Sequence, residues 1–283
     1  MNISGDLRIL DIEESNKILS KKVLTEEPFF VSRVGFYELG RMTTFIRGGR
    51  SLRDKTKFFR EFLKDPAYSL RVERIWKVFS QFYLEGYLAA DIQCVWVGTR
   101  MDEQMALLSK CGDAVVAIDA LGLEPYRSVN PWTSALAGKR VLLVSPFVGD
   151  FQAQYLKRKR IWAGRESVLP DFELVSYRSE FYFKETANWI AVLEKIKNEI
   201  SELEFDIALL SCGPLGLPLG GFIRNDLKKP AIYMGAALQI LFGVTGARWD
   251  SSDYFKELIN ESWIRPSGTK PASADKLDKS CYW

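Results

Sequence analysis

The chain has no histidine among its 283 residues. This absence excludes serine–histidine–aspartate and cysteine–histidine catalysis, and it excludes metal sites built on imidazole. Any general base must therefore be an aspartate, glutamate, lysine, tyrosine or cysteine. Cysteine is also scarce, and the four residues form no C-x-x-C pair: Cys94, Cys111, Cys212 and Cys281. This usage predicts buried, reduced thiols in a cytosolic protein.

Long apolar runs and a charge excess of one sign are missing too. No run approaches the roughly 20 apolar residues that span a bilayer, and no basic stretch followed by an apolar one begins the chain, which predicts no secretory signal. The net charge is +3, from 39 basic and 36 acidic residues. A nucleic-acid-binding protein normally has a stronger and clustered basic excess, so we expect no nucleic-acid role. These features predict a cytoplasmic protein that could also lie against a membrane surface.

The sequence does contain enough apolar material for a large core, with 47% hydrophobic and 13% aromatic residues. Short apolar segments typical of buried strands alternate with amphipathic segments typical of helices. Strands are expected at 29–35, 92–97, 114–118, 141–145, 172–177, 205–211 and 231–234. Helices are expected at 38–45, 103–110, 150–163, 187–203, 217–227 and 236–242. This alternation predicts an α/β, Rossmann-like protein with a mostly parallel sheet, helices on both faces and an N-terminal helical segment within residues 1–27.

We expect the whole chain, residues 1–283, to form a single α/β domain. Its expected parts are a first strand–turn–helix at 28–50, a helical segment at 55–90, the main sheet at 91–250 and a C-terminal extension at 251–283. Pro66 would divide the helical segment into two helices. The chain ends in Cys281-Tyr282-Trp283, and an aromatic end of this kind predicts packing on the body of the protein.

Ligands of open parallel sheets bind beyond the carboxyl ends of the strands, and three strand-to-helix junctions carry suitable residues. The first is Arg33-Val34-Gly35-Phe36-Tyr37-Glu38. Arg33 could bind a phosphate or carboxylate in bidentate fashion, and Gly35 would let a ligand approach the backbone. Glu38 could be a base or a metal ligand. The alternative is a structural arginine–glutamate pair at a helix N-terminus, where an acid is favoured in any case.

The second and third junctions also place glycine just after a strand. Cys212-Gly213-Pro214-Leu215-Gly216 follows the strand at 205–211, and its backbone amides could meet an anion such as a diphosphate. It is neither a Walker loop nor a G-x-G-x-x-G fingerprint, and its glycines could equally serve close packing. Met234-Gly235-Ala236-Ala237-Leu238-Gln239 is the third, where Gln239 could point at the cleft or lie on the surface.

Two further segments carry positive charge: Arg248, which follows the third junction, and residues 157–160. Arg248 could neutralise a phosphate and Trp249 could stack on a base or a sugar, the alternative being a solvated arginine beside a core tryptophan. Residues 157–160, with the sequence KRKR, lie on the expected helix at 150–163. Such a run is typical of a solvated face, and it could also contact anionic lipid or an acidic substrate.

The junctions resemble, in order, those of bacterial glycosyltransferases of the GT-D fold. The resemblance rests on Arg33-x-Gly35-x-x-Glu38, Gly213-Pro214 and Gly235. The late segments are also similar to those of proteins from bacterial capsule and surface-polysaccharide gene clusters, from about residue 29 to the end. These segments are the stretch 235–243, Gly246-x-Arg248-Trp249, Asn260-x-x-Trp263-x-Arg265-Pro266 and the final Cys281-Tyr282-Trp283.

The resemblance to GT-D enzymes implies a nucleotide-sugar donor and a D-x-E motif that helps to hold the donor and a divalent metal. Glu38 keeps the glutamate of this motif, whereas Phe36 stands at the aspartate position. Glu38 is thus the implied metal ligand, but one carboxylate is a poor site for Mg²⁺ or Mn²⁺, which favour several oxygen ligands. Arginines such as Arg33, Arg248 or Arg265 could stabilise a departing diphosphate instead.

The function that the resemblance implies is transfer of a sugar to a glycan or lipid-linked acceptor in surface-polysaccharide biosynthesis. Glu38 would be the catalytic residue, orienting or deprotonating the acceptor hydroxyl. The residues expected at the donor are Arg33, Gly35, Gly213, Pro214, Gly235, Gln239 and Arg248, with Trp249 stacking on a base or sugar. Two alternatives stay open: another group transferase of the same pathway, for a pyruvyl or phosphate group, and a non-catalytic partner in a polysaccharide assembly complex.

Overall fold

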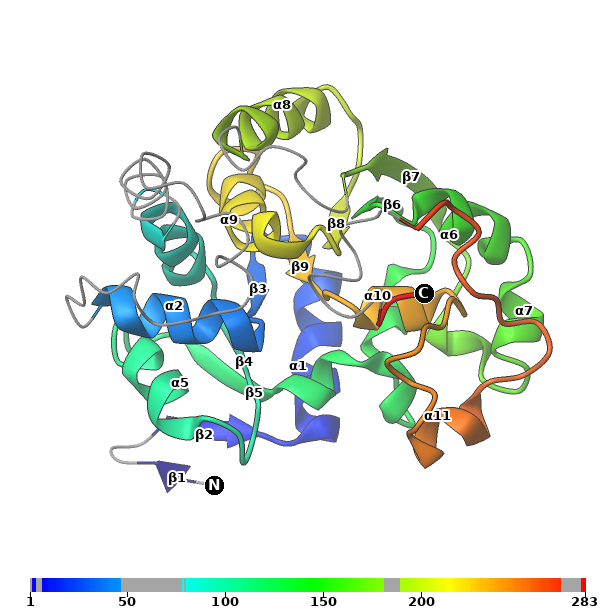
Figure 1. Ribbon diagram of the computed structural model, residues 1–283, viewed down its shortest axis with the longest axis horizontal. Helices are drawn as coiled ribbons and strands as arrows, with labels where there is room; N and C mark the ends of the chain where they lie inside the picture. The colour runs from blue at the N-terminus through cyan, green and yellow to red at the C-terminus, as the bar shows by residue number, and fades with distance from the viewer. Residues whose placement is uncertain (1, 4–6, 47–77, 79, 181–188, 271–280) are drawn as a thin grey trace, which may run out of the picture.

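A computed structural model describes residues 2–3, 7–46, 78, 80–180, 189–270 and 281–283 (Figure 1). The strands are β1 (Asn2–Ile3), β2 (Leu7–Leu10), β3 (Phe30–Arg33), β4 (Ile92–Val95), β5 (Val116–Asp119), β6 (Arg140–Ser145), β7 (Glu173–Arg178), β8 (Ile207–Leu210) and β9 (Ala231–Tyr233). The α-helices are α1 (Ile12–Thr25), α2 (Phe36–Ile46), α5 (Met101–Leu108), α6 (Val148–Tyr155), α7 (Arg158–Ile161), α8 (Trp189–Ser201), α9 (Gly216–Asn225), α10 (Ala237–Leu241) and α11 (Asp253–Leu258). Residues 80–88 are also helical.

The sheet confirms the predicted α/β class. Strands β2 to β9 are all parallel and lie in the order β2-β5-β4-β3-β9-β8-β6-β7, while β1 adds an antiparallel edge beside β2. The chain therefore lays β3, β4 and β5 in one direction, crosses to β6 and β7, and returns through β8 to place β9 beside β3. This return brings residues about 200 positions apart in the sequence onto neighbouring strands.

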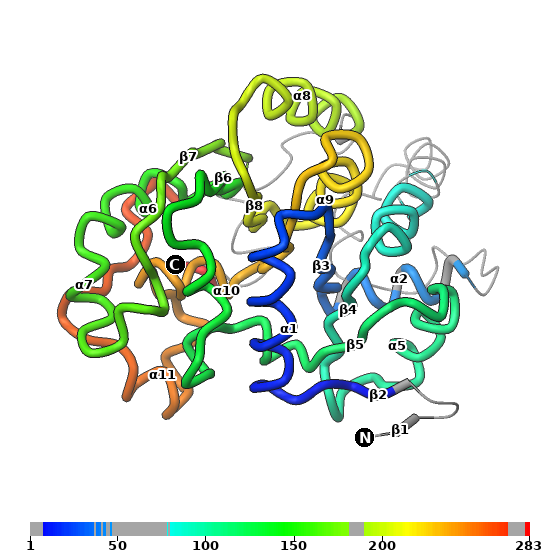
Figure 2. Tube along the Cα trace, turned by 180° about the vertical axis from the view of Figure 1, so that it is seen from behind, coloured from blue at the N-terminus to red at the C-terminus, as the bar shows by residue number. Residues whose placement is uncertain are grey.

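Helices cover both faces of the sheet, because successive residues of a strand point to opposite sides. Along β6, Val141 and Leu143 belong to one buried cluster, and Leu142 and Val144 belong to the other. We call the first the α1 face, covered by α1, α6 and α10, and the second the α9 face, covered by α2, α8, α9 and residues 80–88. In Figure 2, which views the molecule from behind, α1 lies across the near face of the sheet.

The N-terminal helix is confirmed as α1, and its start is explained by a capping box. The Asp11 side chain accepts a hydrogen bond from the Glu14 amide at 2.9 Å, and the Glu14 side chain accepts one from the Asp11 amide at 3.2 Å. No strand was expected within residues 1–27. Residues 7–10 form β2, which pairs with β5. A segment of four residues has no hydrogen-bond partner of its own, so its strand conformation depends on the distant strand β5.

The structure differs from the expected elements at 150–163 and between β5 and β6, and it leaves most of the segment at 55–90 undescribed. The helix expected at 150–163 is wrong as one element, since α6 ends at Tyr155 and α7 begins at Arg158. The break lies at Lys157, whose φ of −105° and ψ of 8° leave the helical region, and beside it the Tyr155 hydroxyl donates to the Phe172 carbonyl at 2.9 Å, just before β7. Between β5 and β6, where no element was expected, lie the 3₁₀ turns η1 (Ala120–Leu123), η2 (Pro125–Arg127) and η3 (Trp132–Leu136). Of the expected helical segment at 55–90, residues up to 77, with Pro66, lie outside the described residues.

The C-terminal end packs on the body, as its aromatic character predicted. The Trp283 carbonyl accepts from the Ala247 amide at 2.8 Å, and the Cys281 carbonyl accepts from the Arg248 amide at 2.8 Å. Both views place this end beside α10 (Figures 1 and 2). Among the described residues, none of the helices combines the length and the apolar character needed to cross a bilayer.

Candidate functional site

The three predicted junctions meet at one edge of the sheet. They follow β3, β9 and β8, which are consecutive neighbours, so their carboxyl ends lie side by side. Two hydrogen bonds join them directly. Arg33 Nη1 donates to the Met234 carbonyl at 2.6 Å, and the Tyr233 hydroxyl donates to the Gly213 carbonyl at 2.8 Å. The tertiary structure thus brings the three junctions together at one candidate site.

Glu38 lies in the first turn of α2, just after β3. Its carboxylate occupies the space where a side chain on Gly35 would begin, so Gly35 is needed for this position of Glu38. Two buried tyrosines lie within its electrostatic reach. Burial raises the pKa of Tyr83 and of Tyr233 well above the usual value, and the negative charge of Glu38 raises both further. Both hydroxyls therefore stay protonated beside the carboxylate at physiological pH.

Two glycines leave open space at the ends of the neighbouring strands. Gly213 and Gly235 have φ angles of +56° and +57°, in the left-handed region that glycine adopts without strain. No heavy atom beyond their immediate neighbours lies within 4 Å of the position that a Cβ atom would take at either residue. The Gly235 amide, however, already donates to the Leu210 carbonyl at 3.1 Å. The open Cα face of this turn is thus what a ligand can approach.

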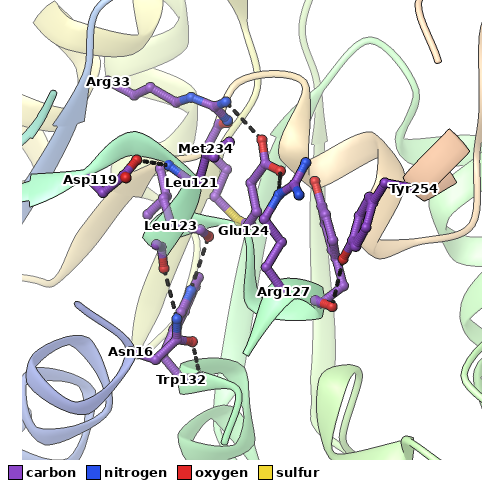
Figure 3. A network of polar contacts seen from close by, with 12 residues as sticks. Asn16, Arg33, Asp119, Leu121, Leu123, Glu124, Arg127, Trp132, Met234 and Tyr254 are labelled. Atoms are coloured by element: carbon purple, nitrogen blue, oxygen red, sulfur yellow. Dashed lines mark hydrogen bonds and ion pairs between the residues drawn. The ribbon is translucent and has the colours of Figure 1, made fainter. Parts of the chain in front are cut away.

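Arg33 is buried in an ion-pair network that the sequence did not suggest (Figure 3). Its Nη2 pairs with Glu124 Oε1 at 3.0 Å, and Arg127 Nε pairs with Glu124 Oε2 at 2.6 Å. The carboxylate of Glu124 lies between the two arginines, so the structure adds a partner of Arg33 that the sequence did not suggest. Two cations share one buried anion, so the network keeps a net charge of +1 that favours an anionic ligand nearby.

The aromatic residues around Arg33 fix its position. The Arg33 guanidinium lies 4.6 Å from the centre of the Trp96 ring, and the Trp96 indole donates to the Val34 carbonyl at 2.9 Å. Phe36 packs against the same ring, with centroids 5.1 Å apart. On the far side, Arg127 lies 4.1 Å from the centre of the Tyr254 ring on α11. The network therefore connects β3 to the C-terminal extension.

The described residues do not form a divalent-metal site at Glu38. Phe36, at the position of the expected aspartate, uses its ring for packing on Trp96. Nowhere in the described part of the chain do three or more cysteine, aspartate or glutamate residues gather as a possible metal site. Mg²⁺ and Mn²⁺ favour several oxygen ligands, so we derive no step through a metal. Thiol chemistry at Cys212 is disfavoured too, because burial raises the pKa of this thiol to about 12.

Gln239, Arg248 and Trp249 lie against the C-terminal end of the chain and α11. The buried Gln239 amide donates to the Tyr282 carbonyl at 2.9 Å, so it is not the surface residue that one alternative expected. Arg248 is exposed and donates to the Tyr282 hydroxyl at 3.1 Å. Trp249 is buried and packs edge-on against Phe255, which fits the alternative of a core tryptophan. Their expected roles at the donor stay predictions.

Sequence reasoning missed Tyr83, Tyr233, Glu124 and Arg127. Glu124 and Arg127 lie in and beside a short 3₁₀ turn that has no helical or strand periodicity. Tyr233 was counted as part of a strand, and Tyr83 as part of the core of a helix. The available signal was the place of Glu124 in the connection that follows β5, which ends at Asp119, since polar residues beyond strand ends are favoured site candidates in parallel sheets.

The fold and the site define an α/β protein with a candidate ligand site at the carboxyl ends of three parallel strands. No protein-family model matches the chain, and no curated protein matches it. One solved structure similar to it is described as "the highly conserved domain of unknown function 1792 has a distinct glycosyltransferase fold". It is 16% identical, with a TM-score of 0.48, over 97% of this chain and 90% of that one.

A second similar structure is a selenomethionine-substituted form of the domain of unknown function 1792. It is 15% identical, with a TM-score of 0.47 and the same coverage of 97% and 90%. TM-scores below 0.5 at this identity do not establish what this chain binds or catalyses. The argument about function therefore depends on the site and on the motifs of the sequence.

Proposed function

We propose that the protein is a glycosyltransferase that moves a sugar from a nucleoside-diphosphate sugar to a hydroxyl of a glycan or lipid-linked acceptor. The observation that carries the proposal is the meeting of the Glu38 turn with the Gly213 and Gly235 turns at one sheet edge. The order of these motifs in the sequence, which resembles that of GT-D enzymes, supports it. The similarity of the late segments to proteins of surface-polysaccharide gene clusters favours a role in that biosynthesis, and the cysteine usage favours a cytoplasmic location.

In the proposed reaction, the acceptor oxygen bonds to the anomeric carbon of the donor sugar. The bond from that carbon to the diphosphate oxygen breaks, and its electron pair leaves with the diphosphate. Glu38 is the general base that takes the proton of the acceptor hydroxyl. Tyr83 and Tyr233 are protonated at neutral pH, because their pKa values are raised, so neither adds a second negative charge beside this carboxylate.

The leaving group needs positive charge, and the Arg33 network supplies it without a metal. The two arginines and Glu124 carry a net charge of +1 in surroundings that exclude most water. Charge fixed in such surroundings stabilises a developing anion more than the same charge in water. The left-handed turns at Gly213 and Gly235 lie on the neighbouring strands and leave open space for the diphosphate.

Thermal-shift binding with a panel of nucleotides and nucleotide sugars tests the proposal, because a ligand of the native state raises its stability. We expect a shift with one nucleotide sugar, equal with and without Mn²⁺. With that donor and an acceptor, Glu38→Gln should lower the transfer rate by at least about 100-fold and leave donor binding intact. Glu85→Gln, at an exposed glutamate of the helix at 80–88, is the matched control. Full transfer activity in Glu38→Gln would remove Glu38 from the chemistry.

A second candidate function is a non-catalytic partner in a polysaccharide assembly complex. The observation that favours it is Phe36, which replaces the expected aspartate and is packed on Trp96. A folded protein that gives no shift across the whole panel, but co-purifies with a pathway enzyme, would favour this function. A shift with a pyruvyl or phosphate donor alone would favour another group transferase.

A further inference from the structure

A pocket lies beside α11, and the residues that line it, between Thr245 and Arg265, do not include the Glu38 turn. Its volume is about 420 Å³, within the range of small-molecule sites. Its apolar wall consists of Trp249, Trp263, Ile259 and Ile264. Two backbone hydrogen bonds join the segments that form this wall. The Thr245 amide donates to the Ile264 carbonyl at 2.8 Å, and the Ile264 amide donates to the Gly243 carbonyl at 3.0 Å.

Two polar groups in the pocket wall are buried without a partner. Thr245 and Trp263 are 7% and 8% exposed, and neither the Thr245 hydroxyl nor the Trp263 indole N–H makes a hydrogen bond within the described part of the chain. Buried polar groups in native proteins are normally satisfied, so two such groups in one pocket call for a ligand or an ordered water. Both atoms are shielded from solvent, so a ligand in the pocket can reach them only if side chains of the lining shift, and the long side chains of Lys256 and Arg265 belong to this lining.

The rim of the pocket is polar and close to neutral. Arg265 pairs with Asp250 at 2.5 Å, and both side chains are about half exposed. Lys256, which lines the pocket, pairs at 2.9 Å with Asp253, which lies outside the lining, so the four charges of the two pairs cancel. The rim therefore offers donors and acceptors side by side without a strong net charge. This arrangement suits a neutral ligand with several hydroxyl groups better than a phosphate or a carboxylate.

From this geometry we propose that the pocket binds one neutral pyranose ring. A pyranose presents an apolar face of C–H groups, which fits the tryptophan wall, and an edge of hydroxyls, which fits the rim. Its hydroxyls accept from the Trp263 indole N–H and exchange hydrogen bonds with Thr245, once Lys256 or Arg265 moves aside. The proposal does not depend on the transfer reaction, although α11 also carries Tyr254, which packs on Arg127 of the Arg33 network.

Saturation-transfer NMR on the full chain, without any nucleotide, tests this pocket. The probes are the methyl pyranosides of glucose, galactose and mannose, methyl N-acetylglucosaminide, and uridine as a nucleobase probe. We expect binding of at least one pyranoside. Thr245→Val and Trp263→Phe should each weaken that binding by about three- to tenfold, as expected for the loss of one hydrogen bond. Thr133→Val, at a buried threonine bonded to the Val168 carbonyl outside the pocket, should leave binding unchanged.

Thermal unfolding of the same variants separates lost binding from lost folding. Thr245→Val and Trp263→Phe each remove a polar group that has no partner, so both should stay folded. Absence of binding by every pyranoside, or equal binding by the variants and the wild type, would overturn the proposal. Binding of uridine alone, weakened by Trp263→Phe, would assign the pocket to a nucleobase and overturn it as well. None of these outcomes depends on whether Glu38 catalyses transfer.

Discussion

Removal of the charge of Glu124 should destabilise the protein strongly. Its side chain is 9% exposed and accepts from two arginines, Arg33 at 3.0 Å and Arg127 at 2.6 Å. In Glu124→Gln, one amide oxygen can still accept, but the amide NH₂ faces the other guanidinium, and two cations lose their only anion in the network. Loss of one partner of a buried ion pair costs about 3–5 kcal/mol. We therefore expect the free energy of unfolding to fall by about 3 kcal/mol.

Urea unfolding followed by tryptophan fluorescence measures this change. Asp253→Asn is the matched control, because it removes the partner of Lys256 in an ion pair whose side chains are 57% and 91% exposed. Such an exposed pair contributes less than about 1 kcal/mol. The reasoning would be refuted if Glu124→Gln lay within about 1 kcal/mol of the wild type, or if the control lost as much stability as Glu124→Gln.

Three other predictions follow from buried groups. Thr245→Val should leave the free energy of unfolding unchanged or higher, whereas Thr133→Val should lower it by about 1–3 kcal/mol, because it leaves a buried carbonyl unsatisfied; urea titration compares the two. Burial raises the pKa of Cys94 and of Cys212 to about 12. As the pH rises, these thiols therefore ionise first in the unfolded chain. The free energy of unfolding should fall between about pH 9 and pH 12, by about 1.4 kcal/mol per pH unit for each thiol. Unfolding at a series of pH values checks this, and unchanged stability across that range would contradict it. Gly220→Ala should cost about 1–3 kcal/mol in thermal unfolding, because an aromatic ring of β3 fills the position of the new methyl group.

The sheet was predictable because each strand carries a local signal. Seven of the strands described in the parallel sheet coincide with apolar segments bounded by turn residues. The exception, β2, is four residues long and is defined by its pairing with β5. The break between α6 and α7 was not predictable either, because residues 155–158 contain no proline or glycine that would signal the end of a helix.

The candidate site shows the same division. The sequence identified Arg33, Glu38, Gly213 and Gly235 through their places just after strands, and the rule for parallel sheets predicted the edge at which they lie. It could not assign the partner of Arg33, because Glu124 is 91 residues away and joins the site only when β5 pairs with β4. The role of Trp263 in a pocket was hidden for the same reason.

By itself, the sequence determined the class of fold, the absence of imidazole chemistry and the residues that end the strands, because periodicity, composition and turn residues are local properties. Only the tertiary structure decided which strand ends are neighbours, which anion pairs with Arg33 and which polar groups are left without a partner. These depend on strand order and on side-chain packing between distant segments. The pairing of β3 with β9, which joins residues 30–31 to residues 231–232, decides which strand ends are neighbours at the candidate site.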